Sequence, residues 1–190
     1  MNLQDFNNAK EQRSFDVIPA GTIATLQMKI RPGGAGEGGC LRRSKAGDSE
    51  ALDCEFAVVD GDFKGRKFWM RFTLEGRTPG HAAAQEISRT LLRAMLESAR
   101  GIRPDDKSDA ARKARQTSGW EDFNGIKFIG KIGIEPAQGQ YPAKNTLLEA
   151  ITPNRKEWHQ PDNAPAPEAA PATQQPAAAT NAIARPEWAK

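Results

Sequence analysis

The side chains best suited to binding chemistry in this sequence are a tryptophan and the basic residues beside it. Lys67, Trp69 and Arg71 occupy every second position of a run with strand periodicity, and Lys64 and Arg66 lie just before or within it. Alternate strand residues share one face, so the indole would stand between two cations. A base stacks on such a ring at ~1–3 kcal/mol while cations contact phosphates. The spacing favours a site for single-stranded nucleic acid, unless the upstream loop or N-terminal arm covers the indole.

Further basic residues stand where such a site could extend. They are Arg31, Arg42, Arg43 and Lys45 in a glycine-rich stretch, and Lys127, Lys131 and Lys144 in later segments. A long, mobile loop over residues 31–48 would let the first group wrap a nucleic-acid backbone, although Arg42 and Arg43 also fit plain solvated loop charge. Asp53 and Glu55, on the outward side of the neighbouring segment, count against a strongly cationic groove. We therefore expect moderate, salt-sensitive affinity for a polyanion.

Residues for catalysis or metal binding are sparse. His81 and His159 are isolated in the sequence, without an adjacent nucleophile. Residues 60–62, Asp-Gly-Asp, indicate a turn, because the later ligands of a calcium loop are missing. Cys40 and Cys54 have no metal-binding spacing and are expected to be free thiols. The sequence therefore predicts no enzyme and no cofactor.

The apolar residues of the first 159 positions mostly alternate, which is the period of half-buried strands. In the first of these segments Thr25, Gln27 and Lys29 fall on the outward face. A turn of the hairpin type at residues 60–62 separates the second segment from the third. The pattern predicts five strands, at residues 22–30, 52–59, 65–74, 126–134 and 145–151.

One long helix is expected between the third and fourth strands. Thr78 and Pro79 are an N-cap and a first-turn proline, and Gly101 is a stop signal. The helical period predicts a core-facing stripe of Ala84, Ile87, Leu91, Ala94, Met95 and Ser98, with Arg89, Arg93, Glu97 and Arg100 in solvent. A basic stretch at 105–116 with interspersed acidic residues favours a short surface helix.

This order of three strands, one helix and two strands predicts a mostly β fold. A five-stranded, partly open barrel of the oligonucleotide-binding (OB) kind, with its helix between strands three and four, hides the edges of short antiparallel strands. An open sheet with a helix packed on one face fits the same pattern. In the barrel, ligands would lie on the outer face of strands two and three and on the adjoining loops.

The chain of 190 residues with a net charge of +3 is expected to form one domain with appendages. We expect an N-terminal arm at 1–14, the binding domain at 15–159 and a disordered Pro/Ala linker at 160–182. Residues 183–190 form a predicted docking peptide with Ile183, Arg185, Pro186 and Trp188. No signal-peptide core or membrane-spanning run is visible, which favours a cytoplasmic protein.

Three motifs resemble a family of uncharacterised phage and prophage proteins. They are FDVIPAG at 15–21, KAGD at 45–48 and VVDGDFKGRK at 58–67, and the likeness extends over about residues 14–151. Members tend to be encoded in replication and recombination modules and are suspected of binding single-stranded DNA. The glycine run at 33–39 is longer than expected for the family. The tail resembles that of bacterial single-strand-binding proteins in plan, but its tip is not acidic.

The resemblance implies a single-stranded DNA-binding accessory protein of a phage module, located in the host cytoplasm. Its terminal peptide would recruit a replication or recombination protein. The alternative is a protein-interaction adaptor that never contacts nucleic acid, which Asp53 and Glu55 favour. Oligomeric state, preference for DNA or RNA and the identity of the tail's partner stay open at this point.

Overall fold

The fold is described by a computed structural model, which covers residues 7–8 and 16–162. The predicted docking residues Ile183, Arg185, Pro186 and Trp188 lie outside the described residues, as does nearly all of the predicted linker. The strands are β1 (Ile23–Arg31), β2 (Arg42–Arg43), β3 (Ser49–Val58), β4 (Lys67–Gly76), β5 (Lys127–Glu135) and β6 (Lys144–Ala150). The helices are α1 (Pro79–Arg100) and α2 (Asp109–Ala114), with 3-10 turns η1 (Glu37–Gly39) and η2 (Trp120–Phe123).

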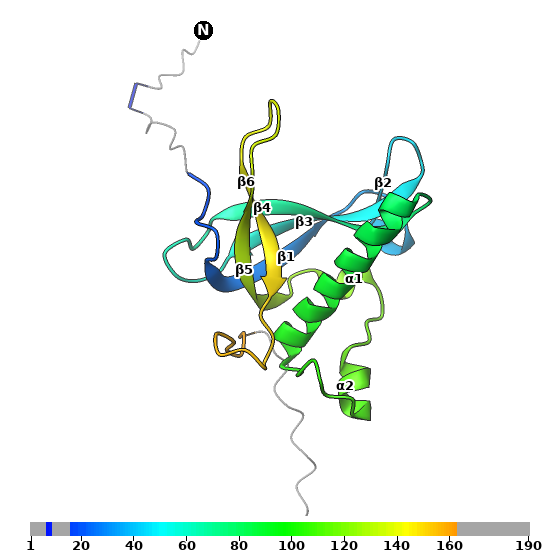
Figure 1. The fold of residues 1–190 in the computed structure, drawn as a ribbon, viewed down its shortest axis with the longest axis vertical. Helices are drawn as coiled ribbons and strands as arrows, with labels where there is room; N and C mark the ends of the chain where they lie inside the picture. The colour runs from blue at the N-terminus through cyan, green and yellow to red at the C-terminus, as the bar shows by residue number, and fades with distance from the viewer. Residues whose placement is uncertain (1–6, 9–15, 163–190) are drawn as a thin grey trace, which may run out of the picture.

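The six strands form one antiparallel sheet. Along it β4 pairs with β3, β3 with β1, β1 with β5, and β5 with β6, while β2 pairs with the N-terminal part of β3. Figure 1 shows α1 running diagonally across one end of the sheet, with α2 beyond its C-terminal end and the β5–β6 hairpin projecting outward. The prediction of a mostly β fold with one long helix is confirmed.

The predicted closed barrel is not confirmed, because no strand ladder joins the terminal strands β4 and β6 in the described part of the chain. These strands nevertheless approach each other through side chains. The Thr146 hydroxyl on β6 lies 3.8 Å from the Met70 sulfur on β4. The sheet is therefore open along one seam.

The core lies between the inward faces of the strands and α1. Phe56 on β3 stacks on Phe68 with ring centroids 5.2 Å apart, and meets Phe72 and Phe128 edge-on at 6.2 and 6.0 Å. All four rings are buried, together with Leu26 from β1. The alternation read from the sequence puts these residues on the inner face, so the core of β1, β3, β4 and β5 follows from strand periodicity.

Helix α1 begins and ends where the sequence predicts. The Thr78 hydroxyl accepts a hydrogen bond from the His81 backbone N–H, and Gly101 adopts the left-handed conformation at the C-cap with φ of 68°. Two face assignments were wrong. Ile87 is 65% exposed, and the buried residues of α1 begin only at Ser88, whereas Glu97 is buried rather than solvated.

Glu97 is buried because the chain after α1 folds back over it. Arg93 and Arg115 both donate to its Oε1 atom, at 2.9 and 2.7 Å. Arg115 also donates to the backbone carbonyls of Asp106 and Arg103, at 2.8 and 2.9 Å. This buried carboxylate therefore anchors the connection that carries α2.

The glycine-rich loop after β1 is compact, which corrects the expectation of a long mobile loop. The backbone N–H groups of Gly33 and Gly34 donate to the Gly39 carbonyl, and Ala35 and Leu41 form a two-way bridge. Leu41 and its neighbour Cys40 are buried in the core. The next strand, β2, has only two residues, which is too short for an alternation pattern to reveal it.

The segment after β6 packs back on the domain. The Trp158 indole N–H donates to the Ser98 carbonyl at 3.0 Å, and Pro161 is buried. Thr25, predicted to lie on the outward face of its strand, is buried because Asp60 and His159 cover it. Within the described ranges, neither helix has the length and apolar character needed to cross a lipid bilayer.

Candidate nucleic-acid interface

Three strands present a regular grid of outward side chains, which we call the three-strand face. The register places residues of β1, β3 and β4 opposite one another in cross-strand rows. Opposite side chains on one face of an antiparallel sheet lie ~5 Å apart. The rows are Arg31, Asp53 and Arg71; Lys29, Glu55 and Trp69; and Gln27, Ala57 and Lys67. Four basic and two acidic side chains give the face a net charge of +2.

Trp69 stands open on this face. Its side of β4 points away from the core, whereas Phe68 and Phe72 on the other side are buried. Trp69 is 51% exposed, and Lys67 and Arg71 flank it along the strand. The structure thus contains the exposed indole between two cations that the sequence predicted.

Both carboxylates of the three-strand face, Asp53 and Glu55, are engaged with these cations. Asp53 accepts from Arg71 Nε at 2.7 Å and from Arg42 Nε at 2.5 Å. Burial alone would raise the pKa of Asp53, but the hydrogen bonds and charges of Arg71 and Arg42 outweigh it and lower that pKa. Asp53 is therefore ionised at neutral pH and shared between two strands.

Glu55 occupies the centre of the grid. Lys67 Nζ lies 2.8 Å from its carboxylate, and Trp69 is its direct cross-strand partner. The hydrogen bond from Lys67 lowers the pKa of Glu55 against the opposing effect of burial, and the charge of Lys67, a hydrogen bond from Trp69 and the charge of Lys29 lower it further. The apolar face of the indole is thus held beside a line of paired charges.

A shallow groove of about 380 Å³ adjoins Trp69. Arg31, Arg71 and Lys144 bring positive charge to it from three strands, so the structure brings these predicted residues together. Lys144 is also paired with Glu135 at 3.1 Å. The groove is lined by Arg31, Asp53, Cys54, Trp69, Met70, Arg71 and Lys144. Burial raises the pKa of the Cys54 thiol, so this cysteine is a packing residue.

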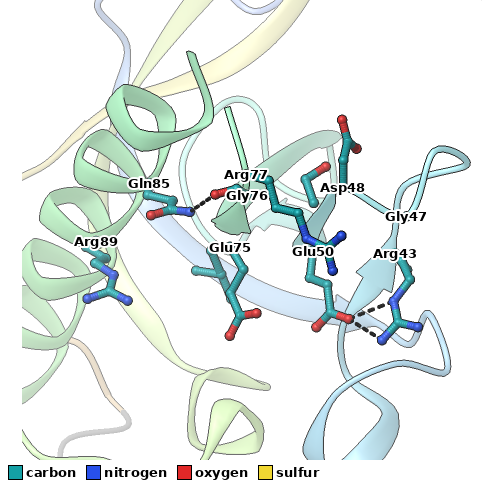
Figure 2. Close-up of a pocket in the computed structure, with 11 residues that line it drawn as sticks. Arg43, Gly47, Asp48, Glu50, Glu75, Gly76, Arg77, Gln85 and Arg89 are labelled. Carbon is teal, nitrogen blue, oxygen red and sulfur yellow. Dashed lines mark hydrogen bonds and ion pairs between the residues drawn. The ribbon is translucent and has the colours of Figure 1, made fainter. Parts of the chain in front are cut away.

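Arg43 belongs to a different site. It pairs with Glu50 at 2.7 Å in a polar pocket of about 590 Å³ between α1 and the β2 end of the sheet (Figure 2). Figure 2 shows Arg43 on one wall, Arg89 on the α1 wall and Arg77 between them. Because Asp48, Glu50 and Glu75 also line it, three arginines are matched by three carboxylates.

The remaining predicted cations are dispersed around the domain. Lys45 lies in the turn between β2 and β3, and Lys64 in the turn between β3 and β4. Arg66 donates to the backbone carbonyl of Asp16. Lys127 lies opposite Gln27 and so continues the third row of the grid onto β5, whereas Lys131 lies opposite Ile23 and pairs with Glu149 at 3.3 Å. Of this group, the register connects Lys127 to the three-strand face.

Two further exposed residues were missed, Lys29 on the three-strand face and Tyr141 in the β5–β6 hairpin. Lys29 is exposed next to Glu55, and strand alternation already placed it outward. Tyr141 is 68% exposed near the tip of the β5–β6 hairpin, three positions before Lys144. Its position in a proline- and glycine-containing loop gave no periodic signal that could have identified it.

The sequence suggested that His159 is isolated, but in the structure it contacts Thr25. Its Nε2 atom lies 3.3 Å from the Thr25 hydroxyl, which donates to Asp60 at 2.5 Å. The carboxylate binds the hydroxyl and not the imidazole, and the hydroxyl is buried, so the three do not form a nucleophile, base and orienting acid in series. In the portion of the chain that the structure describes, no cluster of three His, Cys, Asp or Glu residues could hold a metal ion.

No protein-family model matches the sequence, and no curated protein matches it.

Proposed function

We propose that this protein binds single-stranded DNA on the three-strand face, as an accessory protein of a phage replication or recombination module. The observation that carries the proposal is the exposed indole of Trp69 between Lys67 and Arg71 on one side of a strand. Stacking on the ring and phosphate contacts with the cations need no chemical step. The groove beside Arg31 and Lys144 offers a continuation for the strand.

We also infer that the sheet acts as an OB-like barrel with one seam that lacks strand hydrogen bonds. The order β4, β3, β1, β5, β6, with α1 between β4 and β5 in the sequence, supports this interpretation. OB barrels bind oligonucleotides on their second and third long strands, which correspond here to β3 and β4. The docking role of Ile183, Arg185, Pro186 and Trp188 for a replication or recombination protein rests on the sequence.

Anisotropy of a fluorescent oligothymidylate tests the proposal. Affinity should fall steeply with added salt, because phosphate contacts release counterions. Trp69→Ala should weaken binding about 5- to 100-fold, the equivalent of one lost base stack, while Trp69→Phe keeps most of the affinity. Absence of binding at low salt, or equal affinity of wild type and Trp69→Ala, refutes the proposal.

A protein-interaction adaptor is the second candidate. The ion pairs of Asp53 and Glu55 favour it, because they neutralise cations that a phosphate backbone would otherwise contact. The same titration separates the two functions. An adaptor leaves the oligothymidylate free even at low salt.

A further inference from the structure

The carboxylates of the three-strand face hold two of its cations, Arg71 and Lys67, and also Arg42 on β2. Asp53 bridges Arg42 and Arg71, and its side chain is only 15% exposed beneath them. Glu55 holds Lys67, with its side chain 20% exposed. A phosphate that approaches these three cations therefore meets groups that already have an anionic partner.

Exchange of one anion for another yields little free energy. Surface ion pairs contribute little net free energy, so replacing a carboxylate by a phosphate on the same arginine is close to neutral. The stacking of a base on Trp69 has no such competitor, since its ring is 51% exposed. Arg42, Arg71 and Lys67 should therefore add less to affinity than the stacked base does.

Ligands differ in whether they can use the indole. Duplex DNA presents phosphates, but its bases are stacked within the helix, and an anionic polysaccharide has no bases. An unpaired strand offers both groups. Resting on the proposed function, we infer that Asp53 and Glu55 are specificity-determining residues that restrict the three-strand face to nucleic acid with unpaired bases.

Charge-neutral variants of the two carboxylates test this inference. Asp53→Asn and Glu55→Gln keep the side-chain shape and release the paired cations. Wild type and both variants are titrated with oligothymidylate, a duplex of equal length and heparin at fixed salt. Each variant should bind the duplex and heparin about five- to tenfold more tightly than wild type does, with a smaller gain for oligothymidylate.

Glu86→Gln is the matched control. Glu86 is exposed on α1, away from the three-strand face, and its substitution changes the net charge by the same amount. It should leave all three affinities within about twofold of wild type. An equal gain in duplex binding for Glu86→Gln would assign the effect to bulk charge and overturn the inference.

The outcomes also distinguish failure of this inference from failure of the proposed function. If wild type binds oligothymidylate in a Trp69-dependent way but both variants keep wild-type duplex and heparin affinity, the inference fails and the function stands. If neither wild type nor the variants bind any of the three probes, both fail. Circular dichroism of each variant verifies the fold, and the two substitutions are independent tests should one of them unfold the protein.

Discussion

The Asn145 side chain and the Ile18 backbone hydrogen-bond to each other in both directions, 127 residues apart in the chain. Asn145 Oδ1 accepts from the Ile18 N–H at 2.8 Å, and Nδ2 donates to the Ile18 carbonyl at 2.8 Å and to the Gly133 carbonyl at 3.1 Å. Both residues are buried. The amide thus fastens the segment before β1 to the β5–β6 hairpin.

Asn145→Ala should lower the free energy of unfolding by about 2–4 kcal/mol, because it leaves the buried Ile18 N–H and C=O groups without partners. Urea denaturation followed by circular dichroism measures the change. Gln140→Ala, at an exposed position of the same hairpin, should cost under about 0.5 kcal/mol. Equal midpoints for the two variants would show that the Asn145 bonds contribute nothing.

The buried charge of Glu97 leads to a second prediction. Glu97→Ala leaves Arg115, which is 16% exposed, without its anion and should cost about 3–5 kcal/mol. Amide hydrogen exchange should accelerate first in residues 103–116, because Arg115 holds the carbonyls of Arg103 and Asp106, and later in the strands. Arg112→Ala breaks only the exposed pair with Asp109 and should leave exchange nearly unchanged. Uniform acceleration across the domain would contradict a local anchor.

Strand periodicity predicted most of the fold. It located the five longer strands and the outward set of Lys67, Trp69 and Arg71, because a half-buried strand repeats every two residues. Helix signals at Thr78 and Gly101 fixed α1 in the same way. These features depend only on residues close together in the sequence, so they can be predicted from a single sequence.

The features that the sequence did not predict depend on distant segments. Glu97 has the spacing of a solvent-facing residue, and only the return of the chain through Arg115 buries it. Thr25 is buried by Asp60 and His159, which follow it by 35 and 134 positions. The pairing of Asp53 with Arg42 likewise depends on β2, which is too short to show a period. Tertiary contacts decided each case.

Tyr141 is expected to add a second stacking surface to the proposed interface. It is exposed on the hairpin whose base, at Lys144, borders the groove beside Trp69. Tyr141→Ala should weaken oligothymidylate binding about three- to tenfold, whereas Tyr141→Phe keeps the ring and the affinity. Leu148→Ala, at an exposed apolar position of β6, is the control and should bind like wild type. Unchanged affinity of Tyr141→Ala would limit the site to the sheet.

The glycine-rich excursion after β1 leaves and rejoins one line of pairing on β3. Arg31 pairs with Asp53 and Arg42 with Ala51, so residues 32–41 stand where an uninterrupted strand would have a single residue. Residues 32–41 therefore form an insertion between two adjacent pairing positions on β3, which we call a cassette. Its length does not affect the register that places Trp69 opposite Glu55. Chains with shorter or longer cassettes could keep the same face, provided that apolar residues replace Cys40 and Leu41 in the core.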